Sequence, residues 1–369
     1  MTRVLAASNS AGCKVPFLTV AIPHYRHRCY LEIVLGSVFS QALDDFEIVV
    51  SDDCSPDDSN QVIPEVLHKS GRPFRYYAHP VNLGYDRNVR FCLAAAQGDY
   101  VLLLGNDDAL AGPDVLRKIV AALRELDGPA VAFTNYADYA TGVVTRRAHA
   151  TRYLGSGPST AIRFFRSFSF VSGLLFARRA AFQHETEAWD GSIYYQIYLA
   201  SRIIASGDSL GAIDVCAISK DVRLDGQTVP NYATMWADAP WSFESRHTGL
   251  DSVIRVTAAA VLPTLPQDHH SGALWRIIGQ VLTISYAHWL FEYRCVANWS
   301  FALGVARGMW PGKLLSEYRL DLKDRVRLWM VYAVVTVIGL LFPARLFVRF
   351  RACLAGWLRR KQQSSAGMG

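Results

Sequence analysis

Two adjacent carboxylates, Asp107 and Asp108, are the residues whose types and setting most clearly suggest chemistry. They follow the apolar run 100–104, which is typical of a buried strand, so we expect them on a loop at the end of that strand. Mg²⁺ and Mn²⁺ prefer oxygen ligands and often use only one or two protein carboxylates together with substrate phosphate. The pair therefore indicates a metal site for a phosphorylated substrate, and the competing interpretation is a solvated turn.

A second acidic pair, Asp52 and Asp53, has the same setting. It follows the apolar run 46–50 and opens a loop rich in serine, proline and aspartate. A carboxylate in such a loop can accept a hydrogen bond from the imide N–H of a uracil or thymine, or from a ribose hydroxyl. The alternative roles are loop solubility and capping of the helix that follows.

Both pairs lie in a part of the chain where strand-like and helical patterns alternate, which is typical of an α/β fold with a parallel sheet. Ligands bind such open sheets at the carboxyl ends of the strands, so we expect the two acidic loops to face one site. The predicted strands are 17–22, 46–50, 74–78, 100–104, 130–134 and 171–177, and the predicted helices include 30–39, 88–96 and 194–205. Residues 226–249 are predicted to form a long loop over the site.

Four segments within the first 110 residues form a set: residues 19–26 (TVAIPHYR), 48–55 (IVVSDDCS), 82–88 (NLGYDRN) and 96–108, which begins AQGDY and ends on Asp107 and Asp108. In order and spacing these segments resemble the motifs of the family 2 inverting glycosyltransferases. The version with GYDRN and LGNDD is most similar to the abequosyltransferase-like branch, which builds surface polysaccharides.

The resemblance implies a GT-A fold, with a mostly parallel, Rossmann-like sheet flanked by helices. It also implies transfer from a nucleotide-sugar donor with inversion and without a covalent intermediate. Carried onto this sequence, it puts Asp53 at the base and Arg87 at the diphosphate. Asp107 and Asp108 would hold a Mn²⁺ or Mg²⁺ ion, and Asp107 also belongs to the predicted donor site. The remaining members of that site are Pro23, Tyr25 and Asp52.

The chain departs from the family pattern at one position of the metal motif. The first residue of the usual D-x-D triplet is Gly105 here. The implied ligand set therefore consists of Asp107 and Asp108 alone, which bears on the number of metal ions and their affinity but not on the fold.

An inverting transfer also needs a general base that takes the proton of the acceptor hydroxyl. The family places this carboxylate ahead of a helix, well after the metal-binding acids. Asp190, which precedes the predicted helix 194–205, matches best. Glu187 and Glu185 are the competing candidates, and a helix cap is the structural alternative for Asp190.

Composition sets the broad class. The chain has 369 residues, of which 51% are hydrophobic and 19% charged, so it can bury a large core. Its seven cysteines are scattered without a CxxC pair, which argues against a disulfide framework or a zinc site and favours a reducing cytosol. Residues 1–14 lack the apolar run of a secretory signal.

The net charge of +6 does not indicate nucleic-acid binding, because basic residues are concentrated between positions 319 and 361, where they alternate with apolar runs. This mixture favours an anionic membrane surface. The uncharged run 328–344 is at the lower limit for crossing a bilayer and has arginines on both sides. A single crossing would leave a basic tail on the outer face, against the tendency of basic residues to stay on the cytosolic side. A hairpin kinked at Pro343, with both ends cytosolic, fits these charges better than a single crossing. The aromatic-rich stretch 274–310 indicates either a bilayer interface or a buried helical subdomain.

We therefore predict a catalytic domain over residues 1–250 and a helical, membrane-associating region over residues 251–369. The predicted function is transfer of a sugar to a lipid-linked saccharide acceptor at the cytoplasmic face of the inner membrane. Two other classes compete with it, a sugar-nucleotide-binding scaffold and a nucleotidyltransferase. The turn 23–26 lacks the glycines of a nucleotidyltransferase. A homo-oligomer interface is the alternative role of the C-terminal helices.

Overall fold

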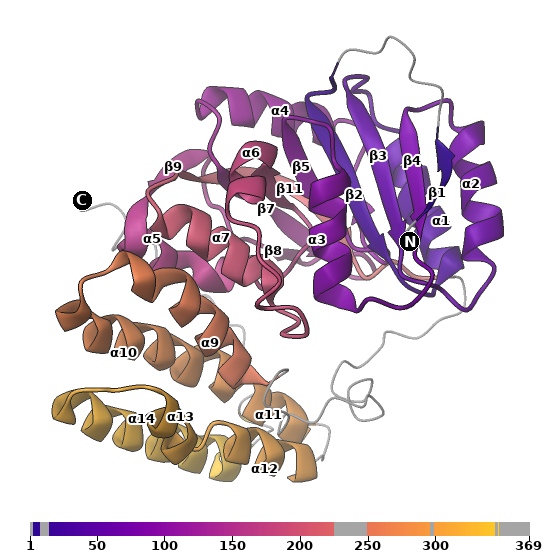
Figure 1. The fold of residues 1–369 in the computed structure, drawn as a ribbon. Coiled ribbons are helices and arrows are strands. Elements are labelled where there is room, and N and C mark those ends of the chain that lie inside the picture. Colours follow the sequence, from indigo (N-terminus) through magenta and orange to yellow (C-terminus); the bar gives the residue numbers. More distant parts are fainter. Residues whose placement is uncertain (1–2, 8–14, 225–248, 296–298, 344–345, 347–369) are drawn as a thin grey trace. The chain divides into compact units, whose positions relative to one another are not determined.

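The computed structural model of the chain describes residues 3–7, 15–224, 249–295, 299–343 and 346 (Figure 1). The chain divides into two compact units, one of residues 1–229 with 255–267 and one of residues 230–254 with 268–369. The described part of the first unit contains a sheet and the helices packed on it, and that of the second unit is helical. Every predicted site residue belongs to the first unit.

The first unit is built on an 11-stranded sheet with the order β1-β4-β3-β2-β5-β10-β7-β11-β6, in which β8 pairs with β7 and β9 with β11 (Figure 1). The strands are β1 (Arg3–Ala7), β2 (Leu18–His24), β3 (Phe46–Asp52), β4 (Phe74–Ala78), β5 (Tyr100–Leu103), β6 (Ala109–Leu110), β7 (Val131–Asp138), β8 (Val144–Thr145), β9 (Arg152–Gly155), β10 (Leu174–Ala177) and β11 (Leu210–Lys220).

The sheet is mixed, whereas the sequence predicted a mostly parallel one. Among the described strands, β2 pairs in parallel with β3 and β5, β3 with β4, and β7 with β11. The other six pairings are antiparallel, and β10 lies antiparallel between β5 and β7. An apolar run predicts that a strand forms but not its direction, which depends on the side from which the chain enters the sheet.

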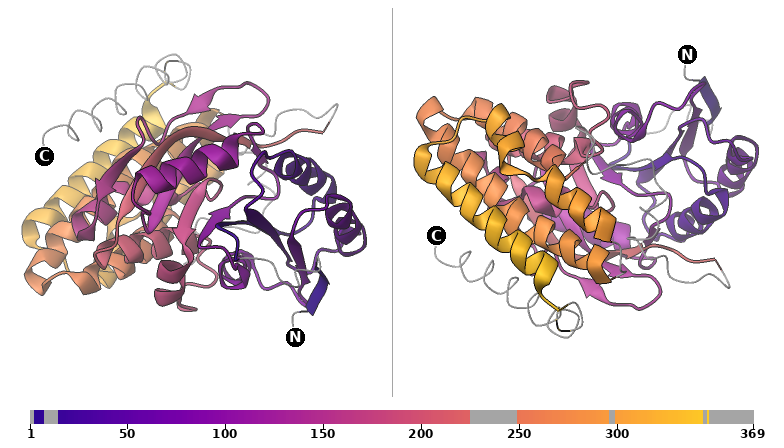
Figure 2. Two further views of the ribbon diagram at one scale, coloured as in Figure 1. Left: turned by 90° about the horizontal axis from the view of Figure 1, so that it is seen from above. Right: turned by 90° about the horizontal axis from the view of Figure 1, so that it is seen from below.

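Alternate residues of the central strands face opposite sides of the sheet, as the period of a strand requires. Ile48 and Val50 of β3 join the core cluster that also contains residues of α1 and α2, whereas Val49 is equally buried but lies outside that cluster. Figures 1 and 2 show α1 and α2 on one face of these strands and α3 on the other. The helices of the first half are α1 (Arg28–Phe39), α2 (Ser59–Lys69), α3 (Tyr85–Ala95), α4 (Val115–Glu125), α5 (Gly157–Phe164), α6 (Arg178–Gln183) and α7 (Tyr195–Ala205).

The strands predicted over 17–22, 46–50, 74–78 and 100–104 correspond to β2, β3, β4 and β5. β2 continues through Pro23 to His24, opposite the end of β3. The strand predicted over 171–177 is confined to β10, and the edge strand β1 was not predicted because its run is short. The predicted loop 226–249 lies outside the described residues, apart from Gly249.

The second unit contains most of the helices of the predicted region 251–369. Tyr286 and Tyr293 are fully buried, whereas Trp299 and Trp310 are 49% and 48% exposed, so the aromatic-rich stretch lies partly in the interior of this unit and partly at its surface. No helix within the described residues combines the length and the hydrophobicity that a membrane crossing requires. The predicted hairpin beyond Pro343 lies outside the described residues, apart from Leu346. The helices here are α9 (Leu250–Val261), which crosses the boundary between the units, α10 (His270–Gln280), the π-helical turn η4 (Val281–Tyr286), α11 (Ala287–Cys295), α12 (Trp299–Gly308), α13 (Pro311–Glu317) and α14 (Leu322–Leu341).

α14 is held in this unit by side chains on one face. The Tyr332 hydroxyl donates to the carbonyl of Ala306 at 2.9 Å, and Thr336 bonds the Tyr286 hydroxyl at 2.7 Å. Its other side is exposed and apolar at intervals of three and four residues, which keeps one face of a helix in line. We call these residues the α14 apolar face: Val326, Trp329, Met330, Val334, Val337, Ile338 and Leu341.

Candidate active site

Asp52 is the last residue of β3, and it is buried. Its Oδ2 accepts a hydrogen bond from the Tyr76 hydroxyl at 2.5 Å, and its Oδ1 accepts one from the main-chain N–H of Ser55 at 2.9 Å. Asp52 therefore fixes the loop after β3. Its contact with the nucleotide-sugar stays a prediction.

Asp53, the next residue, links that loop to the start of α3. Its two carboxylate oxygens accept the main-chain N–H groups of Leu83 at 2.5 Å and Gly84 at 3.0 Å. Burial raises the pKa of Asp53. Gly84 has φ +85°, a conformation that glycine adopts without strain because it has no Cβ. The side chain predicted to contact the base thus also orients α3.

The first turn of α3, residues 85–88, lies between the two acidic loops. Nδ2 of Asn88 donates to main-chain carbonyls at the ends of β2 and β3, at 3.3 and 3.1 Å. Burial, together with the nearby charges of Asp86 and Asp107, raises the pKa of Tyr85. Asn88 therefore anchors this turn to the two strand ends, and the charge of the predicted metal ligand Asp107 acts on Tyr85.

Asp86, in the same turn, holds the loop that leads into α7. It is buried, and it accepts the N–H groups of Ile193 at 2.7 Å and Tyr195 at 3.1 Å and the hydroxyl of Ser192 at 3.3 Å. These bonds satisfy donors at the N-terminus of α7 that no residue of the helix can pair. Asp86 was not predicted as a site residue.

Asp190, the predicted general base, lies in this loop and pairs with two arginines of α3. Its Oδ2 accepts Nε of Arg87 and Nη2 of Arg90, both at 2.9 Å. Its Oδ1 is buried without a hydrogen-bond partner in the described part of the chain. The Arg87 side chain remains 54% exposed. The structure therefore joins the predicted diphosphate ligand to the predicted base.

The competing carboxylates, Glu185 and Glu187, pair with the same arginine, Arg90. We call the five side chains the ion cluster: Arg87, Arg90, Glu185, Glu187 and Asp190. Nη1 of Arg90 lies 3.1 Å from Glu185 and 3.2 Å from Glu187. Burial opposes the charge of Arg90, but its carboxylate partners outweigh burial and raise its pKa. The Glu187 side chain is 79% exposed and that of Asp190 only 9%, so Asp190 is the more enclosed candidate.

Asp107 and Asp108 follow β5, and they differ in setting. Asp108 is buried, and burial together with the charge of Asp107 raises its pKa to about 7. Its Oδ2 accepts the Ser172 hydroxyl at 2.6 Å, and its Oδ1 accepts the N–H of Asp221 at 2.9 Å. Asp107 is exposed, yet the protein atoms around it and the charge of Asp221 raise its pKa. Asp107 is thus the carboxylate that can reach a cation from solvent.

Asp221, directly after β11, was missed by the sequence analysis. The N–H of Val222 beside it donates to the carbonyl of Asp107 at 2.8 Å, and its carboxylate pairs with Lys220 at 2.7 Å. An acid directly after a strand is the signal that led to the other acidic loops, and it applies here too. In the described ranges, no three Asp, Glu, His or Cys side chains are grouped to hold a metal.

The loop after β2 has a fixed and unusual backbone. Arg26 and His27 both adopt left-handed conformations, with φ of 59° and 65°. Nδ2 of Asn106 donates to the carbonyl of Arg26 at 3.1 Å and contacts Nδ1 of His24 at 3.0 Å. The predicted donor residue Tyr25 is 38% exposed at this loop. The loop after β5 therefore supports the loop that was predicted to contact the donor.

Acid is expected to weaken this arrangement through His24. Nδ2 of Asn106 can only donate, so Nδ1 of His24 is the acceptor and its Nε2–H donates to the Ser59 hydroxyl at 2.8 Å, which requires the neutral ring. Burial lowers the pKa of His24 to about 4. The unfolded chain takes up this proton near pH 6.5 and the folded chain does not, so stability present above pH 6.5 is lost as the pH falls toward 4. At pH 5 the loss is roughly 2 kcal/mol.

The measurement is the free energy of unfolding at pH 7 and at pH 5, for the wild-type chain and for His24→Asn. The variant has no imidazole to titrate, so its stability should fall by about 2 kcal/mol less than that of the wild type over this interval. Equal losses in the two proteins would contradict the assignment.

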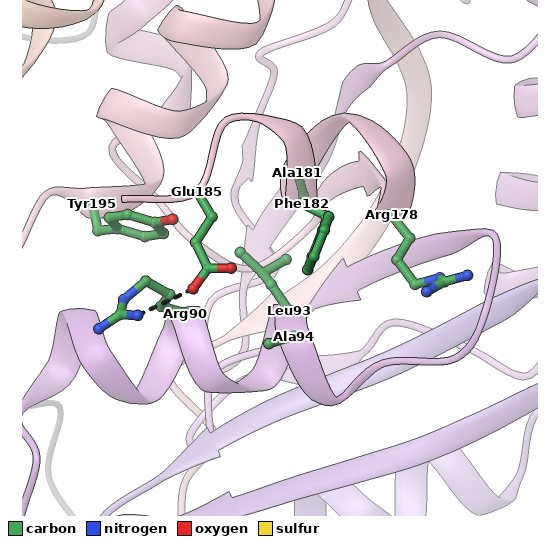
Figure 3. Close-up of a pocket in the computed structure, with 8 residues that line it drawn as sticks. All are labelled: Arg90, Leu93, Ala94, Arg178, Ala181, Phe182, Glu185 and Tyr195. Carbon is green, nitrogen blue, oxygen red and sulfur yellow. Dashed lines mark hydrogen bonds and ion pairs between the residues drawn. The ribbon is translucent and has the colours of Figure 1, made fainter. Parts of the chain in front are cut away.

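A small pocket lies along the later turns of α3, against α6 (Figure 3). Arg90 and Glu185 form its polar end, and Leu93 and Phe182 line its apolar part. Apart from the competing carboxylate Glu185, none of the predicted site residues lines it. This pocket is therefore not the predicted donor site.

Residues 19–185 match the sequence profile described as glycosyl transferase family 2. This segment belongs to the family 2 glycosyltransferases. It contains the four motifs in which the resemblance was found, together with Glu185 of the ion cluster. Asp190 and Asp221 lie beyond the matched residues.

Curated relatives match about a quarter of the chain. Abequosyltransferase RfbV of Salmonella typhimurium is 38% identical over 96 residues, which are 26% of this chain and 29% of that protein. The GalNAc(5)-diNAcBac-PP-undecaprenol β-1,3-glucosyltransferase of Campylobacter jejuni is 33% identical over 97 residues, 26% of this chain and 31% of that protein. The chain thus spans about a third of the length of these relatives. The predicted similarity to the abequosyltransferase-like branch is confirmed.

The fold is also found in solved structures. Residues 1–349 of TarS from S. aureus, in complex with UDP-GlcNAc, superpose with a TM-score of 0.61 at 16% identity, over 88% of this chain and 89% of that one. At this identity the likeness concerns the fold alone. The predicted GT-A fold is confirmed in its coarser form, a mixed α/β sheet flanked by helices.

Proposed function

We propose that the chain is an inverting glycosyltransferase that moves a sugar from a nucleotide-sugar donor to an acceptor hydroxyl. The observation that carries the proposal is the first turn of α3, residues 85–88, which links the loop after β3 to the loop that carries Asp190. Asp53 holds the entry to this turn, and Arg87 pairs with Asp190.

A divalent cation, Mn²⁺ or Mg²⁺, fits the loop after β5. Asp107 offers an exposed carboxylate, while Asp108 is turned toward Ser172 and Asp221. A cation that takes one protein carboxylate and completes its shell with phosphate oxygens and water suits this donor set. When bound, it would neutralise the charge that develops on the departing nucleoside diphosphate.

The chain's own residues have two tasks in the transfer. Arg87 can offer the diphosphate the guanidinium N–H groups that Asp190 does not use, because more than half of its side chain is exposed. Asp190 takes the proton of the acceptor hydroxyl as that oxygen bonds to the anomeric carbon and the sugar–phosphate bond breaks. The electron pair of the broken bond leaves with the diphosphate. A single displacement of this kind inverts the anomeric configuration.

The proposal is tested by incubating the full chain with UDP-sugars and Mn²⁺, with and without acceptor glycans, and measuring release of UDP. Hydrolysis that depends on Mn²⁺ and rises with acceptor supports a transferase. Donor binding without turnover would indicate a scaffold instead, and release of pyrophosphate from a nucleoside triphosphate and a sugar phosphate would indicate a nucleotidyltransferase.

We further propose that the acceptor is a lipid-linked saccharide and that the enzyme works at the cytoplasmic face of the membrane, in surface polysaccharide synthesis. The Campylobacter relative acts on an undecaprenol-linked glycan, as its name states. The α14 apolar face supports a membrane-associating role for the predicted region 251–369. Exposed basic residues at the start of α14 add attraction to anionic lipid, about 1 kcal/mol each. They are Arg319, Lys323 and Arg325.

Two polar substitutions on this face should release the chain from vesicles. Met330 and Val337 are both 55% exposed, so Met330→Gln/Val337→Gln should leave the helical unit folded. Each apolar side chain contributes about 1.5–3 kcal/mol when fully buried. The double variant should therefore bind phosphatidylcholine–phosphatidylglycerol vesicles at least about tenfold more weakly in a flotation assay.

The matched control is Phe182→Gln, which removes an apolar side chain that is 75% exposed in the first unit. It should float as the wild type does. Wild-type chain that stays with the soluble fraction and elutes at twice its mass would contradict membrane binding, and would make the α14 apolar face an interface between two copies.

A further inference from the structure

The loop that carries the two acids is held by a residue far from it in the sequence. Ser172 precedes β10 and is fully buried. Its hydroxyl donates to Oδ2 of Asp108 at 2.6 Å and accepts the main-chain N–H of Gly105 at 2.8 Å. One hydroxyl therefore bonds both the first and the last residue of the loop 105–108.

Gly105 leaves open the space beside this hydroxyl. A Cβ at position 105 would lie 3.2 Å from Oγ of Ser172, 3.0 Å from Oδ1 of Asp107 and 3.1 Å from Oδ2 of Asp108. These separations are shorter than ordinary carbon–oxygen contacts. Any side chain at position 105 would therefore push against the serine hydroxyl and both carboxylates. The glycine at position 105 therefore leaves the room that the hydroxyl of Ser172 needs to bond this loop.

Ser172 is in turn fixed by a buried arginine, Arg147. Burial lowers the pKa of this guanidinium to about 10, which leaves it charged at neutral pH. It lies 5.3 Å from the ring of Tyr136 and 5.5 Å from that of Phe170. Its planar fork of donors can bond several acceptors at once. The acceptors are the main-chain carbonyls of Thr134 (2.8 Å), Ser167 (3.1 Å), Phe170 (2.9 Å) and Ser172 (2.9 Å).

We infer that Ser172 is a positioning residue for the metal loop. Its hydroxyl holds Asp108 and the Gly105 amide, so that the turn between them presents the carboxylate of Asp107 to the cation. Arg147 holds Ser172 in the place where it can do this. The inference rests on the proposed function, because it concerns the cation that Asp107 would bind.

The test is the affinity of the full chain for Mn²⁺, read from the electron paramagnetic resonance of free Mn²⁺, with UDP present and absent. Hydrogen-bond partners behind metal ligands typically change metal affinity 10–100-fold. Ser172→Ala should therefore bind Mn²⁺ at least about tenfold more weakly, with metal-free UDP binding unchanged. The control is Ser169→Ala, in the same segment, whose exposed hydroxyl donates to the carbonyl of Arg166. It should bind Mn²⁺ as the wild type does.

A second variant tests the same contact in a chain that keeps Ser172. Gly105→Ala introduces the Cβ that presses on the serine hydroxyl, so it should also weaken Mn²⁺ binding about tenfold. In the Ser172→Ala background that hydroxyl is gone, so Gly105→Ala should weaken Mn²⁺ binding by a smaller factor than it does in the wild-type chain. The effects of two residues in contact are not additive, whereas those of independent residues are.

Wild-type chain that binds Mn²⁺ with UDP, while Ser172→Ala and Gly105→Ala bind it equally well, would overturn the inference and leave the proposed function in place. Strictly additive losses in the double variant would overturn it too, because Ser172 and Gly105 would then act independently. Wild-type chain that binds no Mn²⁺ with UDP would overturn both this inference and the proposed metal.

Discussion

Asp107→Asn is expected to lower sugar transfer at saturating Mn²⁺ by about 10³-fold or more, because an amide cannot supply the charge that holds the cation at the diphosphate. The fold should be unaffected. Asp107 is exposed, and the protein atoms around it together with the charge of Asp221 raise its pKa, so its ionised form is not stabilised by its surroundings. The melting temperature should therefore stay the same or rise. The measurement is the initial rate of UDP release across a Mn²⁺ titration.

Asp127→Asn is the matched control, since Asp127 is also exposed, and its left-handed φ of 54° is one that asparagine tolerates. It should keep the wild-type rate. If Asp107→Asn retains more than about a tenth of the rate at saturating Mn²⁺, Asp107 is not the ligand on which charge neutralisation depends.

Asp190→Asn is expected to lower turnover by about 10²–10⁴-fold, the usual contribution of a general base. Donor affinity should hold or increase. Oδ2 of Asp190 pairs with Arg87, and removing that negative charge leaves the guanidinium more available to a diphosphate. Single-turnover rates and donor binding measured separately distinguish the two effects.

Glu187→Gln is the matched control, because Glu187 pairs with the same Arg90 but is 79% exposed. It should change turnover little. A collapse of donor affinity in Asp190→Asn, with a large loss of turnover in Glu187→Gln, would reverse the roles of the two carboxylates.

The strand-end acids could be predicted from the sequence because their signal is local. An apolar run followed by Asp-Asp places carboxylates at the edge of a sheet, and both Asp52 and Asp107 lie where this rule puts them. The order and spacing of the four motifs then identified the fold. What local patterns do not contain is the hydrogen bonding of each carboxylate. Asp53 and Asp108 resemble free ligands in the sequence, yet the protein engages both oxygens of each.

The residues that were missed act at long range. Ser172 reaches Asp108 across 64 positions, and Asp86 reaches Tyr195 across 109. No periodicity or spacing reveals such contacts, because they depend on how β10 enters the sheet and how α7 packs beside α3. For a related reason, the sequence of the aromatic stretch 274–310 did not distinguish a bilayer interface from a buried helical subdomain. Composition is the same for an interior and for an interface, and only packing shows that Tyr286 and Tyr293 are buried.

The order of strands in the sheet has a consequence for the chain during its synthesis. β2, β3, β4 and β5 are consecutive in the sequence and adjacent in the sheet, so they can assemble from nearby parts of the chain as these emerge. The position between β5 and β7 stays open until β10 has been made. A nascent chain that stops before Ser172 would carry all four motifs and still lack the hydroxyl that fixes Asp108. The arrangement of the loop 105–108 is therefore completed only after all four motifs have been synthesised.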